Sequence, residues 1–290
     1  MRRYQLPIAS LAACLIAGLP AGVAAQDSAL DTFLKNLAWR NIGPANMGGR
    51  IDQFAVVESK PGTIYVATAS GGLLRTINSG TTWEPLFDNQ KTTTIGSVAV
   101  APTNPDLLWV GTGEANNRQS SSWGDGVYKS TDAGKTWQNM GLPESSAIGQ
   151  VLIDPRNPDV VYVAAVGHLW KANKERGLYK TTNGGKTWEL ALSINEDTGV
   201  TDVRFDPSNP DILYAASYQR RRTPFGYNGG GPGSGIYKST DAGKTWKRLG
   251  LEDTRQISRI RVNPKNPDIV YVAAQGHVWA PNEQRGIYRS

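Results

Sequence analysis

Two carboxylates flank an irregular stretch of the chain and could act as an acid–base pair. Glu114 and Asp125 bracket residues 115–124, which follow no repeating pattern. Two carboxyl groups held about 5–5.5 or 6.5–9.5 Å apart can act together on a bond that lies between them, one as acid and the other as base or nucleophile. Asp and Glu side chains also commonly cap turns by accepting hydrogen bonds from nearby backbone. The pair is therefore a candidate for catalysis and also for a purely structural role.

Aromatic and cationic side chains collect in similar irregular stretches and could bind a ligand. Tryptophan and tyrosine present flat apolar faces, and arginine binds carboxylates with two parallel hydrogen bonds. We predict ligand contacts from ten residues: Arg118, Trp123, His168, Trp170, Arg220, Arg221, Arg222, Tyr227, His277 and Trp279. The run of three arginines could bind an anion or could be a solvated surface.

One of these patterns is duplicated. The sequence Gly-His-aliphatic-Trp contains His168 in its first copy and His277 in its second, 109 residues later. Each copy is followed by an asparagine and an arginine at equal offsets: Asn173 and Arg176, then Asn282 and Arg285. Such duplication indicates that these residues fold the loop, in preference to the alternative that they form two catalytic sites.

The elements that position these residues come from an internal repeat of about 53 residues, and a fixed period indicates a repeated supersecondary unit. Four octapeptides of the form Ser/Thr-x-Asp/Asn-x-Gly-x-Thr-Trp end at Trp83, Trp137, Trp188 and Trp246. A Pro-x-Asn-Pro-Asp turn keeps step with them, beginning at Pro102, Pro155, Pro207 and Pro264. Four matched copies of two motifs indicate one unit repeated along most of the chain.

Each unit predicts four strands. An alternating strand precedes the proline turn, a continuous apolar run such as 107–110 follows it, and a Gly-apolar-Tyr-Lys/Arg strand leads into the octapeptide hairpin and the last strand. This pattern predicts an all-β fold, a β-propeller of four-stranded blades with about five blades present. The predicted propeller covers residues 39–290, with blades at roughly 45–92, 93–146, 147–198, 199–254 and 255–290, the last incomplete.

The octapeptide pattern stops at Ser290, which would open a fifth copy. We therefore expect this chain to be a fragment of a larger propeller. The alternative is a closed ring of five blades, because residues 39–44 resemble the fourth strands after Trp137 and Trp246 and could supply the missing strand.

Blade connectivity predicts which face binds a ligand. In an up-and-down blade the loops after the first and third strands share one face, so both turn motifs lie together. The loops after the second strand lie on the opposite face, and these are the irregular segments, including 218–234 in the fourth blade. Variable loops on a rigid scaffold commonly carry function. We therefore expect the predicted ligand contacts to gather on this face.

The octapeptide resembles the Asp-box repeat, also called the bacterial neuraminidase repeat. In that repeat the acid or amide folds back onto the turn backbone, so the resemblance implies a structural role for Asn78, Asp132, Asn183 and Asp241. The chain as a whole is similar to large secreted bacterial propellers that are grouped with the sortilin N-terminal domain and often described as glycosyl hydrolases.

This resemblance implies two functions. The first, which we favour from the sequence, is a binding or scaffold module for an extracellular glycan or a peptide or protein ligand. The alternative is a glycoside hydrolase of the sialidase or xyloglucanase kind. Xyloglucanase-like propellers carry a catalytic Asp in Thr-Asp-x-Gly-Gly, and here residues 68–72 place Ala69 at that position. Arg50 and Ile51 resemble the first arginine motif of sialidases, but Asp52 follows where those enzymes have proline.

Composition excludes several other classes. The 290 residues hold 31 Lys+Arg, 25 Asp+Glu and a single Cys, and 39% are apolar. These values exclude a disulfide scaffold and a multi-span membrane protein. The lysines recur with the repeat and form no stripe, so we expect no nucleic-acid partner. No phosphate loop and no metal-ligand spacing occurs, so we predict no cofactor and no metal.

The first 25 residues have the basic start, apolar run and small-residue end of a signal peptide. We predict cleavage after Ala25, a lead segment at 26–38, and a secreted, periplasmic or cell-surface location without a transmembrane span. A less favoured alternative is a lipoprotein, because the residues before Cys14 fit a lipid-attachment motif.

Overall fold

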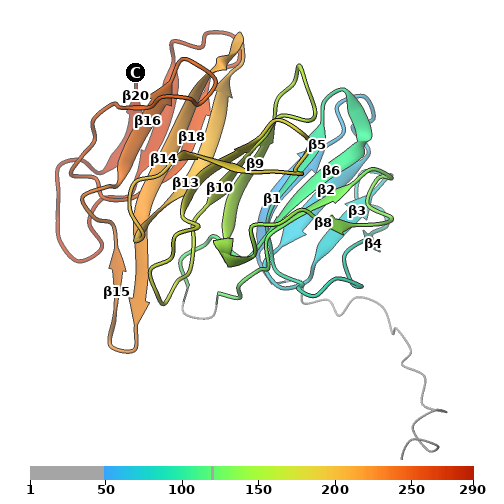
Figure 1. The fold of residues 1–290 in the computed structure, drawn as a ribbon, viewed down its shortest axis with the longest axis horizontal. Helices are drawn as coiled ribbons and strands as arrows, with labels where there is room; N and C mark the ends of the chain where they lie inside the picture. The colour runs from blue at the N-terminus through green and yellow to red at the C-terminus, as the bar shows by residue number, and fades with distance from the viewer. Residues whose placement is uncertain (1–48, 119–120) are drawn as a thin grey trace, which may run out of the picture. The chain divides into compact units, whose positions relative to one another are not determined.

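The computed structural model describes residues 49–118 and 121–290, whose fold is shown in Figure 1. The predicted signal peptide, the lead segment, Cys14 and the segment at 39–44 lie outside these residues. The described part is all β apart from one short 3-10 helix at Pro143–Ser145. The prediction of an all-β fold built from repeated antiparallel sheets is therefore confirmed.

The strands form five antiparallel sheets, which we number as blades 1 to 5 in chain order. Blade 1 contains β1 (Ile51–Val56), β2 (Ile64–Thr68), β3 (Leu73–Thr76) and β4 (Glu84–Pro85). Blade 2 contains β5 (Ile95–Ala101), β6 (Asn104–Thr112), β7 (Val127–Ser130) and β8 (Gln138–Asn139). Blade 3 contains β9 (Ile148–Ile153), β10 (Val161–Ala165), β11 (Gly177–Thr181) and β12 (Glu189–Leu192).

Blades 4 and 5 complete the series. Blade 4 contains β13 (Thr198–Asp206), β14 (Asn209–Thr223), β16 (Gly235–Ser239) and β17 (Lys247–Arg248), with β15 (Gly226–Gly229) paired to the end of β14. Blade 5 contains β18 (Ile257–Val262), β19 (Val270–Ala274) and β20 (Gly286–Arg289). The first strand of each blade contacts the first strand of the next, in the order β1, β5, β9, β13, β18. This is the arrangement of propeller blades.

The core lies between neighbouring blades, because their central strands are covered on both faces. Every residue of β10 is buried, as expected of a continuous apolar run. Between blades 2 and 3, Trp109 and Val163 belong to one buried cluster, and the Trp109 ring meets Trp188 edge to face with ring centroids 6.0 Å apart. Each sheet is therefore stabilised by its neighbours.

The octapeptide turns have one geometry. Asp132 Oδ1 accepts hydrogen bonds from the Thr136 backbone N–H at 2.9 Å and from the Ser130 hydroxyl at 2.8 Å. Ala133 and Gly134 both adopt positive φ, of 58° and 88°, and glycine takes the second position because a side chain there would be strained. The turn is therefore closed by its own side chains.

Asparagine fills the same position in two copies of the turn. Asn183 Oδ1 accepts from the Thr187 N–H at 3.0 Å, while its Nδ2 donates to the Thr187 hydroxyl at 2.8 Å. In the acid copies the threonine hydroxyl donates instead, as Thr136 does to Asp132 Oδ2 at 2.6 Å. The threonine hydroxyl donates to the acid and accepts from the amide, so either residue closes the same turn.

The turns of blades 2, 3 and 4 also dock on the blade before them. The Ala242 carbonyl, in the turn of blade 4, accepts from the Tyr162 hydroxyl and from Lys180 Nζ of blade 3, both at 2.8 Å. The equivalent contacts on the earlier blades join Arg75 to the Ala133 carbonyl at 2.9 Å and Lys129 to the Gly184 carbonyl at 3.3 Å. We call this contact the blade lock.

One expectation about the loops is wrong. The predicted irregular segment at 218–234 of blade 4 begins instead as a regular hairpin, because β14 continues to Thr223 and pairs with β15 (Figure 1). The pairing joins Arg221 to Asn228 and Arg222 to Tyr227. Thr223 pairs with Gly226 at the closed end of this hairpin, and the end of β14 pairs with β15 alone.

Candidate functional site

A cavity of about 300 Å³ opens on the face formed by the loops after the second strands. Three blades contribute to it, and its lining includes Glu114 and Trp123 from blade 2, His168, Trp170 and Lys171 from blade 3, and Arg220 from blade 4. Cavities of this volume with apolar walls and a few convergent polar groups are usual for small ligands. We call it the loop-face pocket. It brings together five of the residues singled out from the sequence.

Glu114 lies two residues after the end of β6, and its side chain is fully buried. Its carboxylate accepts two hydrogen bonds from Arg50, from Nε at 2.7 Å and from Nη2 at 2.5 Å. Arg50 lies directly before β1, so this bidentate ion pair joins blades 1 and 2. The hydrogen bond to Glu114 raises the pKa of Arg50.

Asp52 lies beside this pair, outside the lining of the pocket, and was not a candidate in the sequence analysis. Its Oδ1 accepts from Asn116 Nδ2 at 2.5 Å, and its Oδ2 is buried without a hydrogen-bond partner in the described part of the chain. Burial, and next the negative charge of Glu114, raise the pKa of Asp52 to about 7. A carboxyl group that keeps its proton near neutral pH can serve as a general acid. The sequence signal was its position two residues after Arg50.

Asp125, the other predicted carboxylate, does not line the pocket. Its Oδ2 accepts from the Tyr128 hydroxyl at 2.7 Å, and its backbone N–H donates to the Thr112 hydroxyl at 2.9 Å. These contacts tie the end of the loop to the blade 2 strands. Arg118 is exposed on the same loop, and its backbone N–H donates to the Ser121 hydroxyl at 3.3 Å.

The three consecutive arginines have three different surroundings. Successive residues of a strand point to opposite faces, which separates Arg221 from Arg220 and Arg222. Arg220 is 1% exposed and donates from Nη1 to the Ala115 carbonyl at 2.8 Å. Arg221 forms an ion pair with Asp197. The Arg222 guanidinium lies 4.9 Å from the centre of the Tyr227 ring. The run is therefore neither one solvated surface nor one anion clamp.

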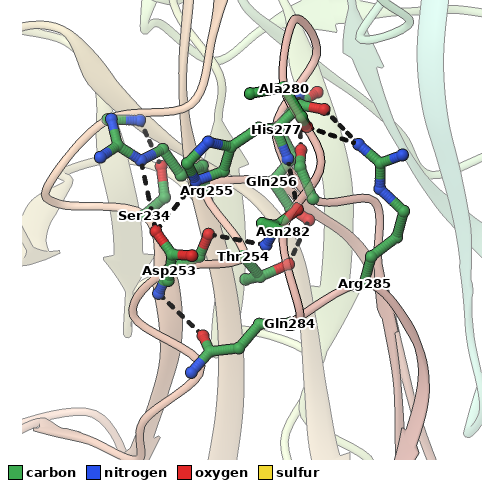
Figure 2. A network of polar contacts seen from close by, with 12 residues as sticks. Ser234, Asp253, Thr254, Arg255, Gln256, His277, Ala280, Asn282, Gln284 and Arg285 are labelled. Atoms are coloured by element: carbon green, nitrogen blue, oxygen red, sulfur yellow. Dashed lines mark hydrogen bonds and ion pairs between the residues drawn. The ribbon is translucent and has the colours of Figure 1, made fainter.

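The duplicated loops share one hydrogen-bond network, which Figure 2 shows for blade 5. Asn282 Oδ1 accepts from the His277 N–H at 3.0 Å, and its Nδ2 donates to the Asp253 carbonyl at 3.1 Å. Arg285 donates to the carbonyls of His277 and Ala280. The His277 ring contacts Asp253 at 2.9 Å.

Blade 3 repeats these contacts residue for residue. Asn173 joins the His168 N–H to the Glu144 carbonyl, at 3.0 and 2.8 Å, and Arg176 donates to the carbonyls of His168 and Lys171. The His168 ring contacts the Glu144 carboxylate at 3.2 Å. The asparagine and arginine therefore hold the loop, as the duplication indicated.

The tryptophans of these loops are left exposed. Trp170 is 45% exposed and Trp279 is 78% exposed, and the Trp123 indole on the blade 2 loop is 68% exposed. Trp123 and Trp170 line the loop-face pocket, whereas Trp279 donates from Nε1 to the Tyr227 carbonyl at 2.7 Å on the far edge of β15. Exposed indoles suit ligand contact.

Neither a metal cluster nor a membrane-crossing helix occurs in the described part of the chain. No group of three or more His, Cys, Asp or Glu residues there is arranged to hold a metal ion. No helix among those residues is long and apolar enough to span a bilayer.

Comparison with known proteins supports the assignment of the repeat and of the fold. The model of the BNR/Asp-box repeat matches residues 237–248, which hold the fourth octapeptide. A xyloglucanase of Paenibacillus sp. is 25% identical over 98% of this chain and 30% of its own length. Xyloglucanase Xgh74A of Acetivibrio thermocellus is 27% identical over 73% of this chain and 27% of its own length.

The solved structures agree on the architecture. The crystal structure of an ancestral GH74 enzyme superposes with a TM-score of 0.62 and 22% identity, covering 81% of this chain and 28% of that enzyme. This chain thus spans less than a third of the length of these relatives. The repeat and the antiparallel blades identify the chain as an Asp-box β-propeller, and these neighbours show that it is similar to propellers of the glycosyl hydrolase group.

Proposed function

We propose that the chain forms part of an extracellular glycoside hydrolase-like propeller and that its loop-face pocket binds the glycan. The observation that carries the proposal is the meeting of two exposed indoles, Trp123 and Trp170, with the buried carboxylate of Glu114 in one cavity. Sugar rings present apolar C–H faces that stack on indoles, and glycosidases work with carboxylates. The xyloglucanase relatives support this function over a scaffold role.

The acid–base pair that we propose is Asp52 and Glu114. Ala69 occupies the position of the catalytic Asp in xyloglucanase-like propellers, and its backbone N–H donates to the Arg50 carbonyl at 2.8 Å. The Arg50, Asp52 and Glu114 group therefore lies next to the position where the acid is missing. In this proposal Asp52, kept protonated first by burial and next by the negative charge of Glu114, donates its proton to the leaving oxygen. Glu114 accepts a proton from the water that attacks the sugar carbon as the glycosidic bond breaks.

A binding module is the second candidate, and the alanine at position 69 favours it. Such a module would use the same pocket and the same indoles without cleaving its ligand, as a sortilin-like scaffold would. Secretion through the predicted signal peptide fits either function.

The experiment is a paired binding and hydrolysis assay on the complete protein. Xyloglucan and its oligosaccharides are the first substrates, followed by other plant and bacterial polysaccharides. Binding with release of reducing ends supports the hydrolase, and both Asp52→Asn and Glu114→Gln should then abolish release while retaining binding. Binding without release in the wild type supports the module. If no glycan binds, the proposal fails.

A further inference from the structure

We propose that the loop-face pocket recognises a glycan that carries a carboxylate, such as a uronic acid residue. This inference rests on the proposed glycan site and names the class of sugar that it takes. It is carried by two buried guanidinium groups, those of Arg220 and Arg176, which have no carboxylate partner among the described residues.

Arg220 lines the pocket with unused donors. A guanidinium group has five N–H bonds. Nη1 is shared among the carbonyls of Glu114, Ala115 and Asn116, whereas the single partner of Nη2 is the Gly167 carbonyl at 3.4 Å. Nε is buried and has no partner among the described residues. The loop carbonyls thus position the group but leave donors on Nη2 and Nε for a further acceptor.

Arg176 places a second buried cation behind the first. Its partners are the carbonyls of Val166, His168, Lys171 and Arg220. Its Nε is also buried without a partner. Burial, and next the positive charge of Arg220, lower the pKa of Arg176 to about 10. Two cations held close together away from water are costly unless an anion compensates them.

The lining supplies one anion, and it is already paired. The negative charge of Glu114 acts on Arg220, but the carboxylate oxygens of Glu114 accept hydrogen bonds from Nε and Nη2 of Arg50. Lys171 adds a further cation at the rim, 4.0 Å from the exposed carboxylate of Glu144. The pocket therefore has an excess of positive charge.

The same pocket offers the indoles of Trp123 and Trp170. A neutral sugar would use these aromatic faces alone. A uronic acid would use both features, because its ring stacks on an indole while its carboxylate compensates the arginines.

The test compares three ligands by isothermal titration calorimetry on the complete protein. The ligands are tetragalacturonate, its methyl ester and a neutral xyloglucan oligosaccharide. We expect tetragalacturonate to bind at least tenfold more tightly than its methyl ester, and salt to weaken the acidic ligand selectively. Equal affinity for acid and ester would overturn the inference and leave the proposed glycan site standing. Absence of binding by all three would refute the site itself.

Two variants separate charge from folding. Lys171→Met removes an exposed cation of the lining, and it should weaken tetragalacturonate binding about threefold without changing the affinity for the neutral ligand. Lys174→Met, on the same loop but outside the lining, is the matched control and should leave both affinities unchanged. An equal loss for acidic and neutral ligands in Lys171→Met would contradict the inference. Binding of an acidic peptide in preference to every glycan would also overturn it.

Discussion

Arg50 and Glu114 are joined by two hydrogen bonds of 2.7 and 2.5 Å, although they lie 64 residues apart in different blades. The Glu114 side chain is fully buried and that of Arg50 is 35% exposed. The pair therefore fixes the first residue of the blade 2 loop against the start of β1.

Glu114→Gln should destabilise the protein by about 1–3 kcal/mol, because an amide cannot replace the charge opposite Arg50. Denaturant unfolding followed by tryptophan fluorescence measures the change. The matched control is Glu84→Gln, which removes the more exposed ion pair with Arg75 and should cost less than about 1 kcal/mol. Equal losses of unfolding free energy in the two variants would show that the buried ion pair stabilises the protein no more than the exposed one does.

Asp52 should make stability fall as the pH rises. Its pKa lies near 7 in the folded protein, against an ordinary value of 3.8. Between these values the folded state holds a proton that the unfolded state has lost, so stability decreases from about pH 4 to pH 7 and is level above.

Asp52→Asn should remove this dependence and should be more stable than the wild type at pH 8, by about 1–2 kcal/mol after allowance for solvent screening. Urea midpoints at pH 5.5 and pH 8 test this, with the exposed Asp159→Asn as control. A parallel pH profile for Asp52→Asn and wild type would contradict the assignment. If Asp52 is the general acid, turnover should also decline above about pH 7.

The turn at Asp132 should accept an amide but not an alanine. Asp132→Asn should stay close to wild type in stability, because Asn183 closes the same turn through its amide. Asp132→Ala removes the acceptor of the Thr136 N–H and should lower the urea midpoint.

Acid titration gives a second readout at this turn. Hydrogen bonds, first from the Thr136 hydroxyl, lower the pKa of Asp132 to about 2. Its contribution to stability is therefore present above about pH 4 and lost as the pH falls toward 2. Asp132→Ala should lack this loss, and an unchanged acid titration would count against the turn geometry.

Trp170→Ala should weaken glycan binding about five- to tenfold, because stacking on one aromatic face contributes about 1 kcal/mol. Its indole is 45% exposed, so the unfolding midpoint should change little. Calorimetric titration with a short oligosaccharide measures the loss. Trp279→Ala removes the matching indole outside the pocket and should leave short-oligosaccharide affinity unchanged. If Trp279→Ala weakened glycan binding and Trp170→Ala did not, the glycan site would lie on blade 5 and not in the loop-face pocket.

The blades could be predicted from the sequence because the residues that form each turn are close together in the chain and recur from blade to blade. The octapeptide turn is closed by its own side chains, as at Asp132, so its geometry follows from eight residues. The role of Asn173 and Asn282 in folding matched loops was likewise readable from equal offsets.

The pocket was harder to predict because it depends on contacts between blades. Arg220 meets Ala115 more than 100 residues away, and no repeat marks that pairing. Asp52 was overlooked because its raised pKa comes from burial and from Glu114, neither of which is visible in the sequence around it. The hairpin of β14 and β15 was missed because its extension beyond the sheet has no counterpart in the other blades.

The blade lock has a consequence for how such a protein can grow. The Tyr162 and Lys180 side chains of one unit receive the Ala242 carbonyl of the next, so a tandem copy of a unit brings both halves of its own interface. Gene duplication could therefore add a blade without inventing a new contact, while the loops on the opposite face remain free to diverge. The twin loops around Trp170 and Trp279, two repeats apart, have the form that such copying would leave behind.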